Sequence, residues 1–565
     1  MLRECDSLAF VGWRVDPMVA FNFARRFKYV FKHSARNTVE SLLQGLSISV
    51  LSTQDSVVLY NCSVAMRYFA DETLEATKLL YWTPPTLPSL LPTLTHSNGI
   101  VRSYGIRQLL RSPDTAQIFY LQQILLTASP LQPRDQYARL SMEEDACSYL
   151  VTASTQSPFL RNHIEWVANV YLRYQDENKP VENRSNALMH TLLDTVMAEL
   201  RKDAAKLSDH DAEVNFFDGI CSLSGSLKPK APENVAKIRE GLVRMTGPSG
   251  SNIPAGIYLP TNPEAKVVGV NVNSGITLQS AKRVPILIVF KTAINGVSQA
   301  TPCIFKVNDD VRNDQLSLQL IEMMRDVFRH HKLPLYLRPY KVISNMTRVE
   351  DKDYLGGIIE CIPSCKSRDE IGKEGSSSLY TYFVEKFGSE DTRAFQVARK
   401  NFIESLAAYS IASYILQIKD RHNGNILIDG EGHLLHIDFG FILSISPAGN
   451  LRFERPDFKM TTEMTELMGN ESSESFHYFQ ELVIKGFILI REYAPELITM
   501  VEMMKTSGYT CFREDTLKSL KERFYVEKSL PKVANKMQSK IFWANNSIFT
   551  NWYDRIQLAQ QKIEY

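Results

Sequence analysis

The chain has 565 residues, which is too long for a single hydrophobic core and predicts two to four domains. Its 64 basic and 63 acidic residues leave a net charge of +1, without the basic excess that nucleic-acid-binding proteins usually show. The eight cysteines are scattered, and the one close pair, Cys361 and Cys365, is poor support for a zinc site. Unpaired thiols in a chain of this size fit a reducing, cytosolic compartment.

A membrane-spanning segment is not predicted. The first residues lack a basic region followed by an apolar run, so we expect no signal peptide. The most apolar stretch, Leu482 to Ile490, is short and is interrupted by Lys485. Any work on a membrane would therefore be done from its surface, on the cytosolic side.

The first 205 residues are predicted to be helical. Apolar residues recur at three- and four-residue spacing from Ile118 to Leu126 and from His163 to Tyr171, and prolines mark short connections. Successive amphipathic helices predict an all-α helical-repeat array. We expect a helical, unassigned segment over 1–75, a helical accessory domain over 76–205, and a more polar linker with helices over 206–255.

After this linker the pattern changes to α+β. One long helix is expected where Leu316, Leu320 and Phe328 share a face, and helices dominate after Thr392 except for a hairpin at Ile426 to Ile437. We therefore expect a two-lobed domain, with a β-rich N-lobe over 256–362 and a helical C-lobe over 363–565. The expected N-lobe strands are Lys266–Val272, Val284–Lys291, Pro302–Val307, Tyr340–Ile343 and Gly357–Ile362.

The hairpin carries a candidate metal site. The turn sequence Asp429-Gly430-Glu431-Gly432 joins its two apolar strands. A two-residue turn would pair Asp429 with Leu434, and continuing that register outward would set Asn425 opposite Asp438. A carboxylate and an amide oxygen at the open end are hard ligands suited to Mg²⁺.

The alternative for this segment is a structural hairpin with a surface aspartate. D-F-G alone is a common tripeptide. Here, however, Asp438-Phe439-Gly440 follows an apolar strand and stands thirteen residues after Asn425, which ends a D-x-x-x-x-N motif. This combination favours a phosphoryl-transfer enzyme.

Lys306 is the second candidate. Strand alternation places it on the opposite face from Phe305 and Val307. A lysine in an apolar strand is costly unless its charge is paired, and carboxylates follow at the start of the long helix. In kinases such a lysine holds ATP phosphates and a helix carboxylate steadies it. A solvent-exposed lysine on an edge strand is the alternative, and the hairpin downstream disfavours it.

Two nucleotide-binding motifs are absent from the sequence. No G-x-G-x-x-G precedes Lys306 and no G-x-x-x-x-G-K-[ST] occurs, which excludes an ordinary protein kinase and a Walker-type NTPase. The corresponding loop, Ser274 to Ser280, offers hydroxyls and one glycine that could hold phosphates. Taken alone, it is also simply a polar hairpin turn.

These motifs together resemble the phosphatidylinositol 3-/4-kinase family. They are D-R-H-x-x-N from Asp420, H-I-D-F-G from His436, and a lysine strand leading into D-D-x-R-x-D from Asp309. The resemblance is strongest to type III phosphatidylinositol 4-kinases of the alpha kind and covers Tyr258 to Tyr565; residues 80–175 more loosely resemble the helical accessory domain of these kinases. The segments that carry it are Tyr258–Ala265, Ile359–Cys365 and Ser446–Leu451.

The resemblance implies a lipid kinase that transfers the γ-phosphate of ATP to the 4-hydroxyl of phosphatidylinositol, peripherally at the plasma membrane. It implies that Lys306 binds an ATP phosphate with Asp314 as its partner, and that Asn425 and Asp438 hold Mg²⁺, or Mn²⁺ in its place. Asn313 stands where the family usually has Gln, a departure that we expect to be harmless because Asp314 is kept. The other implied ATP contacts are Ser274, Gly275, Ile276, Thr277, Leu278, Gln279, Ser280, Ile359, Glu360, Cys361 and Ile362.

Two residues compete for the proton of the inositol hydroxyl. Asp420 stands five residues before Asn425, the interval of the catalytic aspartate in protein kinases. His422 has a pKa suited to neutral pH and resembles the residue invoked in lipid kinases. We expect His422 to accept the proton and Asp420 to orient the loop. His436 either assists at the γ-phosphate or is a satisfied histidine beside a strand.

The segment from Asp438 to Thr461 is nearly neutral, whereas a multiply phosphorylated head group would require a basic cluster. This composition favours an unphosphorylated inositol ring. The residues expected at the activation loop and head group are Phe441, Arg452, Arg455 and Lys459, although the loop around Arg452 and Arg455 departs from the family pattern.

The C-terminus has an apolar stripe that could lie on a membrane, although packing on the chain's own domain is more common for such a stripe. Regulatory or scaffold partners could bind the helical array, and no nucleic acid is expected. The alternatives are a phosphatidylinositol 3-kinase or a catalytically weak membrane scaffold. The stripe consists of Ile541, Ile548, Trp552, Ile556 and Ile563, with Trp543 and Phe549 close to it.

Overall fold

The computed structural model describes residues 87–94, 99–126, 136–173, 193–199, 204–278, 284–446 and 456–545. The chain divides into two compact units. The first unit comprises Met1–Ile164 and Lys179–Lys202, and the second comprises Glu165–Asn178 and Asp203–Tyr565. The segment predicted to be helical over 1–75 lies outside the described residues.

The described part of the first unit is helical. Tyr149 of α9 donates a hydrogen bond of 2.8 Å to Gln117 of α7, and buried leucines such as Leu125 and Leu150 fill the space between helices. The apolar spacing at Ile118–Leu126 corresponds to two short helices that meet at Tyr120. The helices are α5 (Leu87–Leu94), α6 (Gly99–Leu110), α7 (Asp114–Phe119), α8 (Leu121–Leu126), α9 (Gln136–Gln156) and the beginning of α10 (Pro158–Arg173).

The second unit contains an antiparallel sheet, in which seven strands are described. Its order is β1-β2-β4-β5-β7-β6, and β3 also pairs with β4. The strands are β1 (Tyr258–Leu259), β2 (Asn262–Val270), β3 (Ile276–Thr277), β4 (Ile286–Ile294), β5 (Val297–Val307), β6 (Val342–Val349) and β7 (Lys352–Glu360).

The five strands predicted from sequence are confirmed as β2, β4, β5, β6 and β7, with shifted ends. The largest shifts occur in β6 and β7, which the prediction made too short or placed too late. These two strands form one hairpin that turns at Glu350 and Asp351, and both turn residues have left-handed φ angles, of 50° and 63°. Aspartate is common at such angles but glutamate is not, and no glycine, asparagine or proline marks the turn, so the sequence contains only a weak signal for it.

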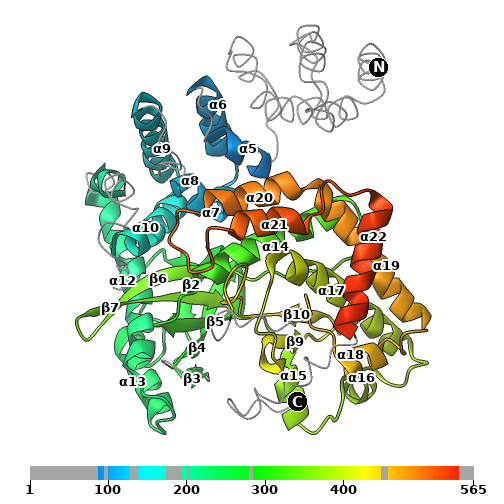
Figure 1. Cartoon of the computed structure of the whole chain (residues 1–565). Helices are drawn as coiled ribbons and strands as arrows, with labels where there is room; N and C mark the ends of the chain where they lie inside the picture. Colours follow the sequence, from blue (N-terminus) through cyan, green and yellow to red (C-terminus); the bar gives the residue numbers. More distant parts are fainter. Residues whose placement is uncertain are drawn as a thin grey trace, which may run out of the picture. The chain divides into compact units, whose positions relative to one another are not determined.

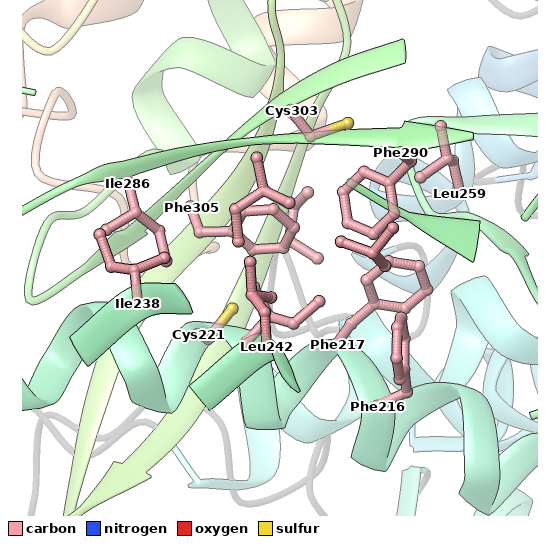
Figure 2. Close-up of a cluster of buried hydrophobic side chains, with 14 of the residues drawn as sticks. Phe216, Phe217, Cys221, Ile238, Leu242, Leu259, Ile286, Phe290, Cys303 and Phe305 are labelled. Carbon is pink, nitrogen blue, oxygen red and sulfur yellow. The ribbon is translucent and has the colours of Figure 1, made fainter. Parts of the chain in front are cut away.

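The core lies between this sheet and two helices, α12 (Ala204–Ser226) and α13 (Asn234–Thr246) (Figure 2). Phe217 and Cys221 of α12 pack against Phe290 and Phe305 of the central strands, with ring centroids of Phe217 and Phe290 5.9 Å apart. Each of these side chains is fully buried. Burial of such aromatic groups typically contributes about 1.5–3 kcal/mol each, so these helices are an integral part of the sheet's core.

The long predicted helix is present as α14 (Arg312–His330). It follows β5 directly, and its apolar face, including Leu316, Leu320 and Phe328, is buried as the periodicity predicted. The first turn of α14 therefore begins five residues after the end of β5, close to Lys306. This connection brings the carboxylates of Asp309 and Asp314 close to Lys306.

The remaining part of the second unit is mainly helical (Figure 1). At its centre is α17 (Arg393–Leu416), buried from Phe402 to Leu416, which packs against α19 and β10. Its N-terminus is capped by Thr392, whose hydroxyl accepts the N–H of Phe395. The other helices are α15 (Arg368–Lys373), α16 (Leu379–Phe387), α18 (Thr462–Leu467), α19 (Glu474–Glu492), α20 (Ala494–Met503), α21 (Thr516–Arg523) and α22 (Leu530–Asn545).

A small second sheet carries the predicted hairpin. Its order is β10-β9-β8, with β8 at Lys366–Ser367, β9 at Ile426–Ile428 and β10 at Leu434–His436. The 3₁₀ turn η4 (Asn423–Asn425) precedes β9 directly. In the described residues, no helix is both long and apolar enough to cross a bilayer.

Candidate active site

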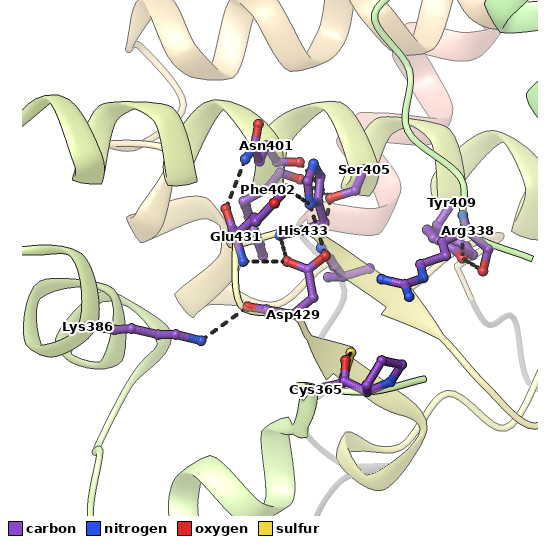
Figure 3. A network of polar contacts seen from close by, with 12 residues as sticks. Arg338, Cys365, Lys386, Asn401, Phe402, Ser405, Tyr409, Asp429, Glu431 and His433 are labelled. Carbon is purple, nitrogen blue, oxygen red and sulfur yellow. Dashed lines mark hydrogen bonds and ion pairs between the residues drawn. The ribbon is translucent and has the colours of Figure 1, made fainter. Parts of the chain in front are cut away.

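The closed end of the hairpin is organised by Asp429 (Figure 3). One carboxylate oxygen accepts the N–H groups of Glu431 and His433, each at 2.9 Å, and the other lies 3.0 Å from Nδ1 of His433. The N–H of Asp429 donates to the carbonyl of His433, and Gly432 has a φ of +91°, which favours glycine. The loop therefore contains three residues.

The predicted register of this hairpin is wrong by one residue. Leu434 pairs with Ile428, and His436 pairs with Ile426. A two-residue turn would have paired Asp429 with Leu434. The longer loop forms because the Asp429 side chain closes it through two backbone N–H groups and Gly432 supplies the left-handed position of a three-residue hairpin loop.

Two neighbouring helices hold this turn in place (Figure 3). From α17, Asn401 donates to the carbonyl of Glu431 at 2.9 Å, and the hydroxyl of Ser405 accepts the N–H of Leu434 at 2.8 Å. From α16, Lys386 donates to the carbonyl of Asp429 at 3.2 Å. The hairpin is thus fixed at its closed end, and this fixes where its open end points.

At the open end, the N–H of Ile437 donates to the carbonyl of Asn425 at 3.1 Å. Asn425 is therefore opposite Ile437, and Asp438 lies one residue further along. The prediction that Asp438 would be opposite Asn425 is wrong by this one residue. The amide nitrogen of Asn425 donates to the carbonyl of Asp420 at 3.2 Å. Both candidate metal ligands remain at the same end of the hairpin.

The backbone at Asp438 is held in a left-handed conformation, with a φ of 61°. Its N–H donates to the hydroxyl of Tyr340 at 3.2 Å, while Arg421 donates to the carbonyls of Ile437 and Asp438. Non-glycine residues at such angles are strained and cluster at functional sites. Its carboxylate is exposed to solvent.

Lys306 points away from the core that buries Phe305 and Val307, as its strand alternation predicted. Its ammonium forms an ion pair of 3.3 Å with Asp309. The expected partner, Asp314, instead accepts the N–H of Phe439 at 2.7 Å. Asp314 therefore holds the backbone of the D-F-G segment and acts on Lys306 through its charge. The ion pair with the ammonium is formed by Asp309, which is nearer to Lys306 along the chain.

The charges of these groups are coupled. Burial alone would lower the pKa of Lys306, but the carboxylates of Asp438, Asp309 and Asp314 raise it above its ordinary value. Desolvation acts to raise the pKa of Asp438, yet Lys306 and Arg421 hold it below its ordinary value. Asp438 is thus ionised, and Lys306 is charged, at neutral pH.

Asp314 behaves differently from Asp438. Burial and the neighbouring charge of Asp438 raise its pKa to about 7. Only one of these two carboxylates carries the low pKa that a metal ligand requires, and it is the exposed one. The pair therefore consists of an ionised, exposed carboxylate, that of Asp438, and a buried carboxylate, that of Asp314, which accepts a hydrogen bond from the backbone.

The loop from Asp420 to Asn425, which we call the catalytic loop because it contains the candidate catalytic residues, places His422 beside Gly424. Nδ1 of His422 accepts the N–H of Gly424 at 3.1 Å, and burial lowers the pKa of the ring below its ordinary value. Since a backbone N–H can only donate, Nδ1 carries no proton, and the proton of the neutral ring is on Nε2. In this arrangement the free edge of His422 is a donor.

His436 is buried in β10 and its ring stacks on Tyr409, with centroids 4.8 Å apart. Burial and the cation of Arg421 hold its pKa well below the ordinary value, so the ring is neutral. Its Nδ1 is buried and has no hydrogen-bond partner among the described residues. One ring nitrogen of His436 thus has no partner in the part of the chain that the structure describes, and its assistance at the γ-phosphate stays a prediction.

The segment from Asp438 to Thr461, which contains the expected activation loop, contacts residues 419–423 near both of its own ends. The carbonyl of Phe441 accepts the N–H of Lys419 at 2.9 Å. Lys459, expected at the head group, is only 8% exposed and donates to Oδ1 of Asn423 at 2.8 Å. Arg452 and Arg455 lie outside the described residues.

The loop expected to hold phosphates is described only as far as Leu278, so Gln279 and Ser280 lie outside. The hydroxyl of Ser274 accepts the N–H of Val289 at 2.9 Å and donates to the carbonyl of Asn271. A Cβ added at Gly275 would lie 2.3 Å from Ile238, so close packing against α13 requires glycine there. The outer residues, Ile276 and Thr277, form β3.

The adenine-strand candidates lie at the end of β7. Ile359 pairs with Ile304, two residues before Lys306 on β5, and Lys306 itself pairs with Gly357, so this end of β7 lies beside the lysine. The N–H of Glu360 is taken by the carbonyl of Lys341 at 2.8 Å, and that of Cys361 by Pro302 at 3.3 Å. Ile362 follows directly beyond the strand.

The C-terminal stripe is divided by the structure. Ile541 is fully buried in α22, which packs on α19, whereas Trp543 is 69% exposed. The first residue of the predicted stripe thus faces the protein, and Trp543 does not share its face. The other members, Ile548, Phe549, Trp552, Ile556 and Ile563, lie outside the described residues.

Sequence reasoning missed several residues of this site: Tyr340, Asp309, Arg421 and Asn423. Arg421 lies within the D-R-H motif, and its position between two singled-out residues was the available signal. Tyr340 had no such signal, because it is 98 residues from Asp438 along the chain.

The second unit has a sheet followed by a helical region. The lysine of β5, the D-F-G segment after β10 and the loop before β9 lie close enough for their charges to interact. This arrangement defines a kinase-like catalytic domain. Residues 300–514 match the family model of phosphatidylinositol 3- and 4-kinase. The chain therefore contains a phosphatidylinositol 3- and 4-kinase domain, and the resemblance drawn from its motifs is confirmed.

Curated relatives extend the similarity over nearly the whole chain. Phosphatidylinositol 4-kinase stt4 of Schizosaccharomyces pombe is 33% identical over 98% of this chain and 30% of its own length. Phosphatidylinositol 4-kinase alpha 1 of Arabidopsis thaliana is 34% identical over 100% of this chain and 27% of its own length. Phosphatidylinositol 4-kinase alpha 2 of the same plant is 40% identical over 62% of this chain and 65% of its own length. The chain thus spans less than a third of the first two relatives.

Proposed function

We propose that this chain transfers the γ-phosphate of ATP to the 4-hydroxyl of phosphatidylinositol and so forms phosphatidylinositol 4-phosphate. The convergence of Lys306, Asp314 and Asp438 in one charge cluster is the observation that carries the proposal. Phosphoryl transfer depends mainly on positioning and charge neutralisation, and this cluster supplies both a cation and an ionised carboxylate. The 4-position is supported by the relatives, which are phosphatidylinositol 4-kinases.

The donor set at the hairpin's open end fits magnesium. Asp438 is exposed and keeps a low pKa, and Asn425 uses its amide nitrogen as a donor, which directs its Oδ1 elsewhere. A carboxylate and an amide oxygen are hard ligands. When bound, Mg²⁺, or Mn²⁺ in its place, would neutralise charge on the phosphates of ATP. The ammonium of Lys306 would then bind a phosphate oxygen in place of the Asp309 carboxylate with which it now forms an ion pair.

For the proton of the inositol hydroxyl, the hydrogen bond at Nδ1 of His422 disfavours this residue and leaves Asp420 as the acceptor. With Nδ1 engaged by Gly424, a neutral His422 offers a proton instead of accepting one. We therefore assign acceptance to Asp420 and donation toward the phosphoryl oxygens to His422. His436 would assist only through its unpartnered Nδ1.

Adenine would bind at the end of β7, with Ile359 lining its site. Since the N–H of Glu360 is already used by Lys341, the groups left to adenine are the carbonyl of Glu360 and the backbone of Ile362, beside Cys361. The Ser274–Ser280 loop would cover the phosphates through backbone groups rather than the Ser274 hydroxyl.

The wider organisation is proposed on the same basis. Residues 76–205 would form a helical-repeat accessory domain that binds regulatory or scaffold proteins, and 206–255 would lead from it into the kinase. The N-lobe would span 256–362 and the C-lobe 363–565. Phe441, Arg452, Arg455 and Lys459 would belong to the activation loop that binds the lipid head group, at the cytosolic face of the plasma membrane.

The test is transfer of labelled γ-phosphate from ATP, with Mg²⁺, to phosphatidylinositol vesicles by the full chain, with the product isomers resolved. Label at the 4-position is the expected result. Label at the 3-position would keep the site and overturn the regiochemistry. Absence of label on any inositol lipid, from protein that still binds ATP, would overturn the proposal.

A further inference from the structure

Asn313 joins three segments that are far apart in the sequence. It is the second residue of α14 and is 3% exposed. Its amide nitrogen donates to the carbonyl of Gly440 at 3.0 Å and to the hydroxyl of Thr510 at 2.9 Å. Thr510 lies on the loop after α20, and the next residue of that loop, Cys511, accepts the N–H of Ser444. The amide therefore sits between the helix, the D-F-G segment and this loop.

The first turn of α14 forms two hydrogen bonds with the backbone of the D-F-G segment. Asp314 accepts the N–H of Phe439 at 2.7 Å, and Asn313 donates to the carbonyl of Gly440. The residue just before, Asp438, holds a left-handed backbone conformation that is strained for a non-glycine residue. Such a conformation persists only if the surrounding bonds hold it, and two of these bonds come from adjacent residues of one helix.

The amide of Asn313 is also placed at some cost. A carbonyl can only accept, so Gly440 fixes which end of the amide faces it. The other end, Oδ1, is buried and has no hydrogen-bond partner among the described residues. A buried polar atom without a partner lowers stability, and a methyl or isopropyl group would avoid that loss. The hydrogen bonds that the amide nitrogen donates to Gly440 and Thr510 give a reason for an asparagine at this position.

We infer that Asn313 is a positioning residue that holds the D-F-G segment, and with it Asp438, and that Thr510 sets the length of side chain accepted there. This inference rests on the proposed function in so far as Asp438 serves phosphoryl transfer. A glutamine is one methylene longer, and its nitrogen would be driven into Thr510 in this buried site. Asn313 and Thr510 thus form a matched pair, in which asparagine has the length of side chain that this site accepts.

The test compares Asn313→Ala, Asn313→Gln, Thr510→Ala and the double variant Asn313→Gln/Thr510→Ala in the full chain. A displacement of about 1 Å at a reacting group can lower a rate by about 100-fold. We expect Asn313→Ala and Asn313→Gln to lower kcat by about 10- to 100-fold while the KM for ATP changes by less than about threefold. Removing the Thr510 side chain makes room, so the double variant should recover most of the kcat that Asn313→Gln loses.

A matched control is available in β6. Asn345 is also 3% exposed and also donates to a threonine hydroxyl, that of Thr347, at 3.0 Å, and its partners do not include the D-F-G segment. Asn345→Ala should lose stability without losing kcat per folded molecule. A purely structural role for Asn313 would give the same pattern as this control and would overturn the inference.

A second measurement does not depend on lipid transfer. Amide hydrogen exchange at Phe439 and Gly440 should quicken by about tenfold or more in Asn313→Ala, and stay unchanged in Asn345→Ala. If the wild-type chain labels no inositol lipid, the proposed function fails, and the exchange result still decides whether Asn313 holds the segment. Unchanged exchange at both amides, or an Asn313→Gln loss that Thr510→Ala does not relieve, would overturn the inference.

Discussion

Asp438 combines an exposed carboxylate with a strained and heavily bonded backbone, and this contrast separates its two roles. The backbone bonds from Tyr340 and Arg421 fix where the carboxylate points, while Lys306 and Arg421 keep it ionised. Changing the side chain alone should therefore remove the charge and leave the local fold intact.

Asp438→Asn tests that separation. Loss of a single preorganised charge typically costs about 100- to 1,000-fold in rate, and we expect a loss of at least this size in kcat for lipid phosphorylation. Stabilisation by ATP with Mg²⁺, measured as a shift in Tm, should disappear, while the Tm without nucleotide stays within about 2 °C. Asp326→Asn is the control, because Asp326 is 60% exposed on α14 and should change neither quantity.

Asp420 and His422, in the neighbouring catalytic loop, can be ranked by how much each contributes to the rate of phosphoryl transfer. If Asp420 accepts the hydroxyl proton, Asp420→Asn should lower kcat by about 100- to 10,000-fold, the usual contribution of a general base. His422→Gln retains a donor and should cost about tenfold or less. Measurement of kcat for both variants at saturating ATP checks the order, and the reverse order would return proton acceptance to His422.

The β9–β10 hairpin shows at the element scale how a distant turn supports the site. Its closed end is held by a side chain that makes three hydrogen bonds, and by Asn401, Ser405 and Lys386 from two helices. The open end carries the candidate metal ligands. Loss of the turn should thus weaken the fold and, through it, the geometry at Asn425 and Asp438, which lie four and nine residues from Asp429.

Asp429→Ala removes all three of these hydrogen bonds. With about 1 kcal/mol for each, we expect the free energy of unfolding to fall by about 2 to 3 kcal/mol, as measured by urea denaturation. Glu431→Ala changes an exposed side chain in the same turn and should stay within about 0.5 kcal/mol of the wild type. Equal effects of the two variants would contradict the role given to Asp429.

At the scale of the second unit, α10 is joined to the sheet by an ion pair. Arg173 lies 2.5 Å from Asp353 of β7, and both side chains are one third exposed. Hydrogen bonding to Arg173 lowers the pKa of Asp353 below its ordinary value. A carboxyl group with a lowered folded-state pKa stabilises the protein above its unfolded-state pKa, and that contribution is lost as the pH falls through the folded-state value.

The contribution of this pair should be small because water screens it. We expect Asp353→Asn to lower the free energy of unfolding by about 0.5 kcal/mol at pH 7, a typical value for a partly exposed pair. The difference from the wild type should shrink once the pH falls below about 4 and vanish at lower pH. Chemical denaturation at several pH values checks this, and a difference that grows toward low pH would contradict the sign.

How much of the molecule the sequence predicts follows from which interactions are local. The five strands and α14 were predicted because their apolar spacing reflects burial directly. The hairpin was predicted, but its register depended on the Asp429 side chain closing a three-residue loop, which a rule based on turn length alone does not include. Asp309 took the place of Asp314 beside Lys306 because loop geometry decides which of several carboxylates reaches a cation.

Contacts between distant segments were not predictable from one sequence. Nothing near Tyr340 indicates that it meets the N–H of Asp438, and nothing near Thr510 indicates that it meets Asn313. Likewise, the polar composition of 206–255 did not indicate that Phe217 and Cys221 enter the core of the sheet. These contacts arise from tertiary packing, which leaves no periodic signal.

That core has a practical consequence for following the protein's opening motions. Cys221 and Cys303 are fully buried within it, and burial raises the pKa of each thiol to about 12. Because thiolates, not thiols, react with alkylating reagents, neither residue can be labelled while the helices cover the sheet. Cys365 is partly exposed, although its pKa is also raised, to about 11. The rates at which Cys221 and Cys303 are alkylated, measured by mass spectrometry after timed labelling, would therefore report how often α12 separates from the sheet. No engineered probe would be needed.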